Sequence, residues 1–167
     1  MTELAEASRH LPDARVCHLF EWIEGRMCPG RCWNDTRVII FTEYEDTLRY
    51  LQRQLDGAFS DTNDARRRIA IYSGEASSQK SHREEIKRAF NTEPSHHPVR
   101  ILLATDAARE GLNLQAYCHH LFHFDVPWNP SRMEQRNGRI DRKLQPAPES
   151  LASHTSYLLF RSASGPV

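Results

Sequence analysis

The chain has 167 residues, of which 39% are hydrophobic and 26% are charged. This composition excludes a disordered or membrane-embedded protein, and the length suits one domain with a buried core. The 22 basic and 22 acidic side chains give a net charge of zero, whereas a protein that binds nucleic acid on its own is more often basic. The sequence has no run of 18 apolar residues and does not begin like a signal peptide, so we expect a cytoplasmic protein.

The first half of the chain alternates between helical and strand patterns. Apolar residues at helical spacing predict a helix that is capped by Asp13 and extends to about Glu24. The apolar run at 37–42 predicts a strand buried on both faces, and the pattern at 42–55 predicts a helix. Residues 56–68 are polar and lack periodicity, which predicts a surface loop.

The second half continues the alternation. A helix capped by Ser77 or Ser78 is expected to end at Phe90, and Ser131 is a possible N-cap of a later helix. Strands that alternate with helices over short connections predict an α/β fold with a parallel sheet, whose ligands bind beyond the carboxyl ends of the strands. The predicted strands of this half are 69–72, 99–104, 119–124 and 156–160.

The most informative stretch is 126–142, which reads VPWNPSRMEQRNGRIDR. On a helix, Gln135, Arg139 and Arg142 share one face within roughly 60°. Guanidinium groups bind phosphate oxygens two bonds at a time, so this face predicts a site for an anion such as a nucleoside triphosphate. Gly138 is expected inside the helix, where glycine costs about 1 kcal/mol relative to alanine and often marks a close approach. The alternative is a solvated basic turn of helix.

A second informative stretch is 101–115, which reads ILLATDAAREGLNLQ. Thr105, at the end of a predicted strand, could offer its hydroxyl and backbone N–H to a phosphate. The alternative is an ordinary strand-to-helix turn with Thr105 or Asp106 as its N-cap. The phosphate-binding face predicted further along the chain makes the functional interpretation preferable.

The cysteine and histidine patterns give little support for a metal site. Cys28 and Cys32 form a C-x3-C pair within the spacing of zinc ligands, but the sequence has no second close pair. We therefore favour ordinary reduced cysteines over a zinc site. No Ser-His-Asp or Cys-His catalytic arrangement can be recognised, and no metal ligand is predicted.

These motifs resemble those of a known family. WNP followed by QRNGRIDR resembles the last conserved motif of superfamily-2 helicases. The resemblance is greatest to the Swi/Snf-type branch, in the subgroup of the bacterial RNA-polymerase-associated ATPase and the phage-defence (DISARM) helicases. Residues 101–115 resemble the fifth motif of that family, and 41–44 resemble the fourth. Between them, the Ser73-Gly74 turn and Arg83 resemble a further motif.

The resemblance implies a RecA-like three-layer α/β/α sandwich over residues 13–162, a helicase C-terminal domain with a lead-in at 1–12 and a tail at 163–167. It implies that Arg136 supports the helix. It also implies the functional residues. The arginine fingers on the ATP phosphates would be Arg139 and Arg142. The nucleotide cleft would contain Gln135, Glu110, Gly111 and Asn113. The nucleic-acid backbone would meet Thr105, Ser73, Gly74 and Thr42.

Two motifs of an ATPase are absent from the sequence, namely a phosphate-binding G-x4-G-K-[ST] loop and an acidic motif for Mg²⁺. In the family both belong to a first lobe. The chain therefore resembles the second lobe, which would share ATP with an N-terminal lobe of the same protein, leave Mg²⁺ to that lobe and act on nucleic acid, with duplex DNA preferred. Alone it should hydrolyse no ATP. Two alternatives stay open: a nucleic-acid or protein-interaction module that has lost ATP chemistry, and an unrelated nucleotide-binding α/β protein.

Overall fold

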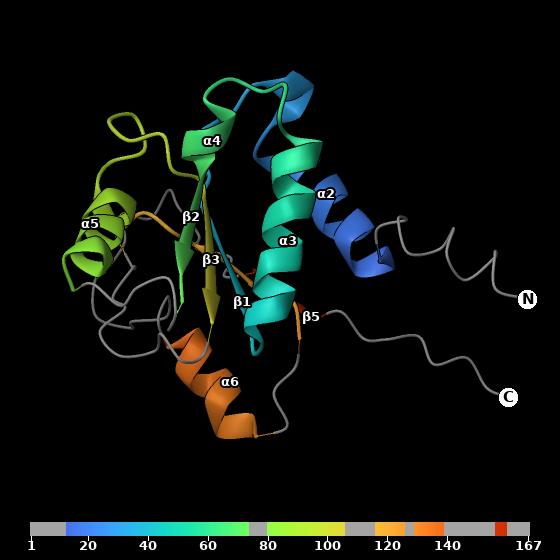
Figure 1. Cartoon of the computed structure of the whole chain (residues 1–167), viewed down its shortest axis with the longest axis vertical. Coiled ribbons are helices and arrows are strands. Elements are labelled where there is room, and N and C mark those ends of the chain that lie inside the picture. Colours follow the sequence, from blue (N-terminus) through green and yellow to red (C-terminus); the bar gives the residue numbers. More distant parts are fainter. Residues whose placement is uncertain (1–12, 74–79, 106–115, 126–128, 139–155, 160–167) are drawn as a thin grey trace, which may run out of the picture.

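The computed structural model describes residues 13–73, 80–105, 116–125, 129–138 and 156–159 (Figure 1). Its centre is a five-stranded sheet with the order β2-β3-β1-β4-β5, in which every neighbouring pair is parallel. This confirms the predicted α/β class with a parallel sheet. The strands are β1 (Val38–Thr42), β2 (Ile69–Tyr72), β3 (Ile101–Thr105), β4 (His120–His123) and β5 (Ser156–Leu159).

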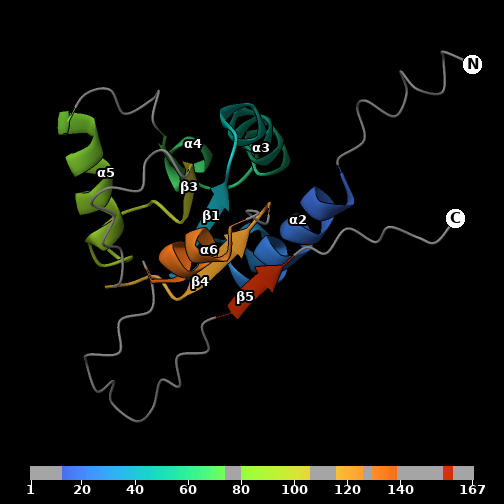
Figure 2. The same cartoon turned by 90° about the horizontal axis from the view of Figure 1, so that it is seen from below.

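The central strand β1 supplies two hydrophobic cores because successive side chains of a strand point to opposite faces. Val38 and Ile40 pack with α2 (Ala14–Arg26) and α3 (Glu45–Ala58) on one face, whereas Ile39 and Phe41 pack with α5 (Lys80–Asn91) on the other. Figure 2 shows α2 and α3 on one side of the sheet and α5 on the opposite side. The helices are α2 (Ala14–Arg26), α3 (Glu45–Ala58), α4 (Ala65–Arg68), α5 (Lys80–Asn91) and α6 (Pro130–Asn137), with a 3-10 turn η2 (Pro29–Arg31).

Some predicted helix boundaries are correct and others are wrong. Asp13 caps α2 as predicted, since its carboxylate accepts a hydrogen bond from the backbone N–H of Arg15. The helix predicted from residue 42 begins only at Glu45, because Thr42 still belongs to β1 and pairs with Thr105. Ser131 is not an N-cap, and Ser77 and Ser78 lie outside the described residues.

The loop predicted at 56–68 contains the short helix α4, which the sequence pattern did not indicate. Arg68 ends this helix and is buried, and its guanidinium donates to the backbone oxygens of Asn63 and Pro98. The short helix α4 is thus stabilised by the hydrogen bond from Arg68 to the distant Pro98 oxygen and not by an apolar stripe. Within the described part of the chain, no helix is long and apolar enough to cross a membrane.

Candidate functional site

The carboxyl ends of three neighbouring strands carry hydroxyl side chains that the family resemblance implied as nucleic-acid contacts. Thr42 and Thr105 are register partners of β1 and β3, and Ser73 directly follows β2. The backbone N–H of Phe124 donates to the oxygen of Phe41, so β4 ends at the same edge. The carboxyl ends of β2, β3, β1 and β4 therefore meet at one edge of the sheet.

All three hydroxyl residues are buried, each with about 1% of its surface exposed. The Thr42 hydroxyl donates to Asp125 Oδ2 at 2.5 Å, and the Thr105 hydroxyl donates to Glu45 Oε1 at 3.4 Å. In this conformation the Thr42 and Thr105 hydroxyls therefore bind other side chains at the sheet edge. Gly74, predicted to act with Ser73, lies outside the described residues.

Helix α6 lies beyond the carboxyl ends of β1 and β3 (Figure 1). The side chain of Asn129 caps it, accepting hydrogen bonds from the N–H and the hydroxyl of Ser131 at 3.0 and 2.7 Å. Pro130 occupies the first turn, where its missing N–H leaves no bond unmade. The N-cap is thus Asn129, two residues before the predicted Ser131. The sequence N-P-S accounts for this, because Pro130 favours the first helical position and leaves Asn129 as the cap.

The far end of α6 also differs from the prediction. The helix ends at Asn137 and Gly138 is its C-cap, so the expected position of Gly138 inside the helix is wrong. The φ of Gly138 is −61°, and its N–H donates to the Glu134 oxygen at 2.8 Å. This backbone conformation is open to any residue, so Gly138 by itself gives no evidence of a ligand.

Two adjacent residues of α6 differ in their exposure. Gln135 is exposed, whereas Arg136 is buried with 1% of its surface exposed. Arg136 therefore fixes the helix to the sheet edge, which confirms the supporting position implied for it. Its guanidinium carbon lies 5.6 Å from the centre of the Phe41 ring. A second tie is the ion pair between Arg132 and Glu43, at 2.9 Å.

Asp125 is the acceptor that sequence reasoning missed. Its backbone oxygen accepts from Arg136 Nη1 at 3.0 Å, and its carboxylate lies 3.5 Å from Arg136 Nη2. Arg136 Nη1 also lies 3.4 Å from His123 Nδ1, while His123 Nε2 contacts Asn137 Oδ1 at 2.9 Å. In the tautomer that satisfies both contacts, His123 is neutral and donates to Asn137. The sequence offered one signal for it, namely that Asp125 directly follows the predicted strand 119–124.

The remaining predicted site residues fall outside the part of the chain that the structure describes. Of the predicted nucleotide contacts, the structure describes Gln135, which is exposed on α6. The residues whose positions stay predictions are Arg139, Arg142, Glu110, Gly111 and Asn113.

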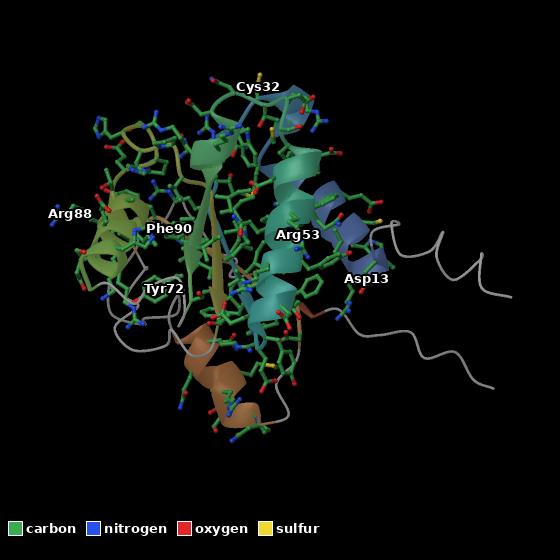
Figure 3. The ribbon with its side chains drawn as sticks, in the orientation of Figure 1. Asp13, Cys32, Arg53, Tyr72, Arg88 and Phe90 are labelled. Atoms are coloured by element: carbon green, nitrogen blue, oxygen red, sulfur yellow. The ribbon has the colours of Figure 1, made fainter. Side chains whose placement is uncertain are left out.

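Arg83, from the motif between the fourth and fifth, lies beside Tyr72. Its guanidinium carbon is 6.0 Å from the centre of the Tyr72 ring. Tyr72 and Phe90 both lie between the sheet and α5 (Figure 3). Among the residues that the structure describes, the buried Arg83 Nε and Tyr72 hydroxyl have no hydrogen-bond partner.

The C-x3-C pair divides between core and surface, with Cys28 buried and Cys32 exposed. Burial raises the pKa of the Cys28 thiol, which disfavours the thiolate form that binds metals. Within the described ranges, no three His, Cys, Asp or Glu side chains are grouped so that they could hold a metal ion.

Comparison with known proteins gives a family match over most of the chain. Residues 15–143 match the helicase conserved C-terminal domain. An uncharacterized ATP-dependent helicase, YqhH of Bacillus subtilis, is 38% identical over 110 residues, covering 65% of this chain and 17% of that protein. The RNA polymerase-associated protein RapA of Serratia proteamaculans is 46% identical over 44 residues, covering 26% of this chain and 4% of RapA. The chain therefore spans a small part of the curated relatives it matches.

Solved structures confirm the predicted RecA-like fold. The C-terminal part of the Fun30 ATPase domain superposes with a TM-score of 0.60 at 18% identity, covering 84% of this chain and 42% of that one. The C-terminal domain of the SWI2/SNF2 ATPase of Sulfolobus solfataricus gives 0.51 at 21% identity, covering 71% and 45%. At these identities the likeness establishes the fold.

Proposed function

Because the chain belongs to the helicase conserved C-terminal domain family and resembles its Swi/Snf-type members, we propose that it is the second lobe of an ATP-dependent nucleic-acid translocase. The observation that carries this proposal is the placement of α6. Buried Arg136 fixes the helix across the strand ends, Gln135 is exposed, and the helix leads directly to Arg139.

ATP would bind between this lobe and a first lobe that supplies the phosphate-binding loop and holds Mg²⁺. Arg139 and Arg142 would contact the phosphates and neutralise the charge that develops during transfer. Such an arginine raises the rate of phosphoryl transfer by about 10³–10⁵. The exposed amide of Gln135 fits a position at the edge of this cleft. Glu110, Gly111 and Asn113 would border it.

Nucleic acid, with duplex DNA as the preferred substrate, would pass over the edge formed by Thr42, Ser73, Gly74 and Thr105. Because the described hydroxyls of this set are buried, their contact with a phosphate would use backbone N–H groups or follow a rearrangement on binding. The net charge of zero fits a lobe that shares its substrate with a partner lobe.

ATP turnover tests the proposal directly. The purified 167-residue chain should hydrolyse no ATP, and a polypeptide that joins it to its first lobe should show turnover that duplex DNA increases. Turnover is measured as phosphate release with and without DNA. Turnover by the 167-residue chain alone would contradict the proposal that it supplies only one half of the ATP site. If the joined protein binds DNA but has no turnover, the alternative of a module without ATP chemistry is correct.

A further inference from the structure

We propose that Asp125 is a positioning residue that joins the end of β1 to α6 and so orients the segment leading to Arg139. Its effect on catalysis presupposes the function proposed above, whereas its effect on α6 does not. Asp125 lies two residues beyond the end of β4 and is not among the residues that the family resemblance implied.

On the β1 side, the Asp125 carboxylate makes two kinds of contact. Oδ2 accepts from the Thr42 hydroxyl at 2.5 Å. Both carboxylate oxygens lie 2.9 Å from the backbone N of Glu43, which donates to them. These bonds satisfy the hydroxyl of Thr42, the last residue of β1, and the backbone N–H of Glu43, which follows the strand. They also make the position of the carboxylate depend on the Thr42–Glu43 backbone.

On the α6 side, the same residue meets the guanidinium of Arg136. Nη1 donates to the Asp125 backbone oxygen at 3.0 Å, and Nη2 pairs with Oδ1 at 3.5 Å. The Arg136 side chain is 0% exposed, while the Asp125 side chain is 20% exposed. Removing one member of a buried ion pair leaves the other charge uncompensated, so Asp125 matters far more to α6 than a surface partner would.

The second ion pair that connects α6 to the sheet edge, Arg132 with Glu43, can be compared with the pair of Arg136 and Asp125. Arg132 and Glu43 form an ion pair at 2.9 Å, but their side chains are 39% and 25% exposed. A pair in which both partners remain partly exposed contributes less than a pair with a fully buried member. Among the contacts of α6 with the sheet edge, the pair of Asp125 and Arg136 is therefore the more buried one, and a displacement of Thr42–Glu43 would reach α6 chiefly through the Asp125 carboxylate.

Hydrogen exchange of the 167-residue chain tests the structural part. In Asp125→Asn, exchange of the amides of residues 132–137 should rise at least about tenfold, because α6 loses its buried charge partner. Amides of β3 serve as the internal reference for global unfolding and should change less. In the control Glu43→Gln, α6 exchange should rise less than about threefold. Equal α6 exchange in the two variants would overturn the proposal.

A second variant guards against misfolding of Asp125→Asn. Thr42→Val removes one donor to the carboxylate and leaves Asp125 and Arg136 in place. We expect a rise of α6 exchange of about threefold to tenfold, since one hydrogen bond to a charged group is lost. If Thr42→Val leaves α6 exchange at the wild-type rate, β1 and α6 are not joined through Asp125.

The catalytic part is tested in the protein that joins both lobes. Asp125→Asn should lower kcat by about 10- to 100-fold, because misplacement of a catalytic group has effects of this size, and leave KM for ATP within about twofold. A general loss of folded protein would instead lower the active fraction, which titration of bound ATP reports. Normal kcat in Asp125→Asn together with impaired Arg139→Ala would overturn the inference alone. Normal kcat in Arg139→Ala would overturn the proposed function instead.

Discussion

At the scale of single residues, burial decides the chemistry of the cysteines. Cys118 is 0% exposed, and its sulfur lies 3.5 Å from the Arg37 oxygen and 3.4 Å from the His120 oxygen. Burial raises the pKa of the Cys118 thiol to about 12. Because the thiolate is the reactive form, Cys118 should be inert at neutral pH. Cys17 and Cys32 are exposed.

Alkylation with iodoacetamide at pH 8 should therefore modify Cys17 and Cys32 and spare Cys118, as read by peptide mass spectrometry. The urea-unfolded chain, in which all cysteines react, is the control. The raised pKa of Cys118 also has a pH consequence. Its contribution to stability is complete below the ordinary pKa near 9.0 and is lost as pH rises towards 12. Labelling of folded Cys118 as fast as Cys17 would contradict its burial.

At the scale of secondary-structure elements, a buried arginine stabilises the end of α5. Arg37 is 1% exposed, and its Nη1 donates to the backbone oxygens of Phe90 and Thr92 at the C-terminus of the helix. Its Nε donates to the Val99 oxygen at 3.2 Å. Burial, followed by the nearby Arg100 charge, lowers the pKa of Arg37 to about 10, so the group stays charged at neutral pH. A cation at the negative end of a helix is favourable.

Arg37→Ala should lower the free energy of unfolding by about 2–4 kcal/mol, because several carbonyl groups lose their donor and a buried side chain is removed. Arg53→Ala is the matched control, since Arg53 is exposed on α3 (Figure 3) and its loss should change stability by less than about 0.5 kcal/mol. Urea denaturation measures both. Similar values for the two variants would show that Arg37 does not hold α5.

The same contacts show what the sequence could predict. Strands such as β1 and β3 were predictable because a parallel sheet buries both faces and requires continuous apolar runs. The cap at Asn129 was missed because Ser131 is also a good cap. The partnership of Asp125 with Thr42 was beyond pattern analysis, since these residues are 83 positions apart and meet only because β4 lies beside β1.

At the scale of the whole molecule, the sheet order brings the motifs together. β1 lies between β3 and β4, so the ends of the three strands form one edge, and α6 lies beyond that edge (Figure 1). The sequence predicted this edge because strands in parallel sheets end on the same side. The position of the other half of the proposed ATP site could not be predicted from this sequence. The sequence contains no phosphate-binding loop, and under the proposed function the anion that Arg139 and Arg142 would contact is held by another lobe.

Single-turnover ATP hydrolysis by Arg139→Ala, in the protein that joins both lobes, is the most direct test of this account. We expect kcat to fall by at least about 10³ while ATP affinity stays within about threefold, because the arginine acts on charge that develops during transfer. Arg132→Ala, which removes an exposed cation from the same segment, should lower kcat less than about fivefold. Wild-type turnover in Arg139→Ala would contradict the assignment of this lobe as the donor of the catalytic arginines.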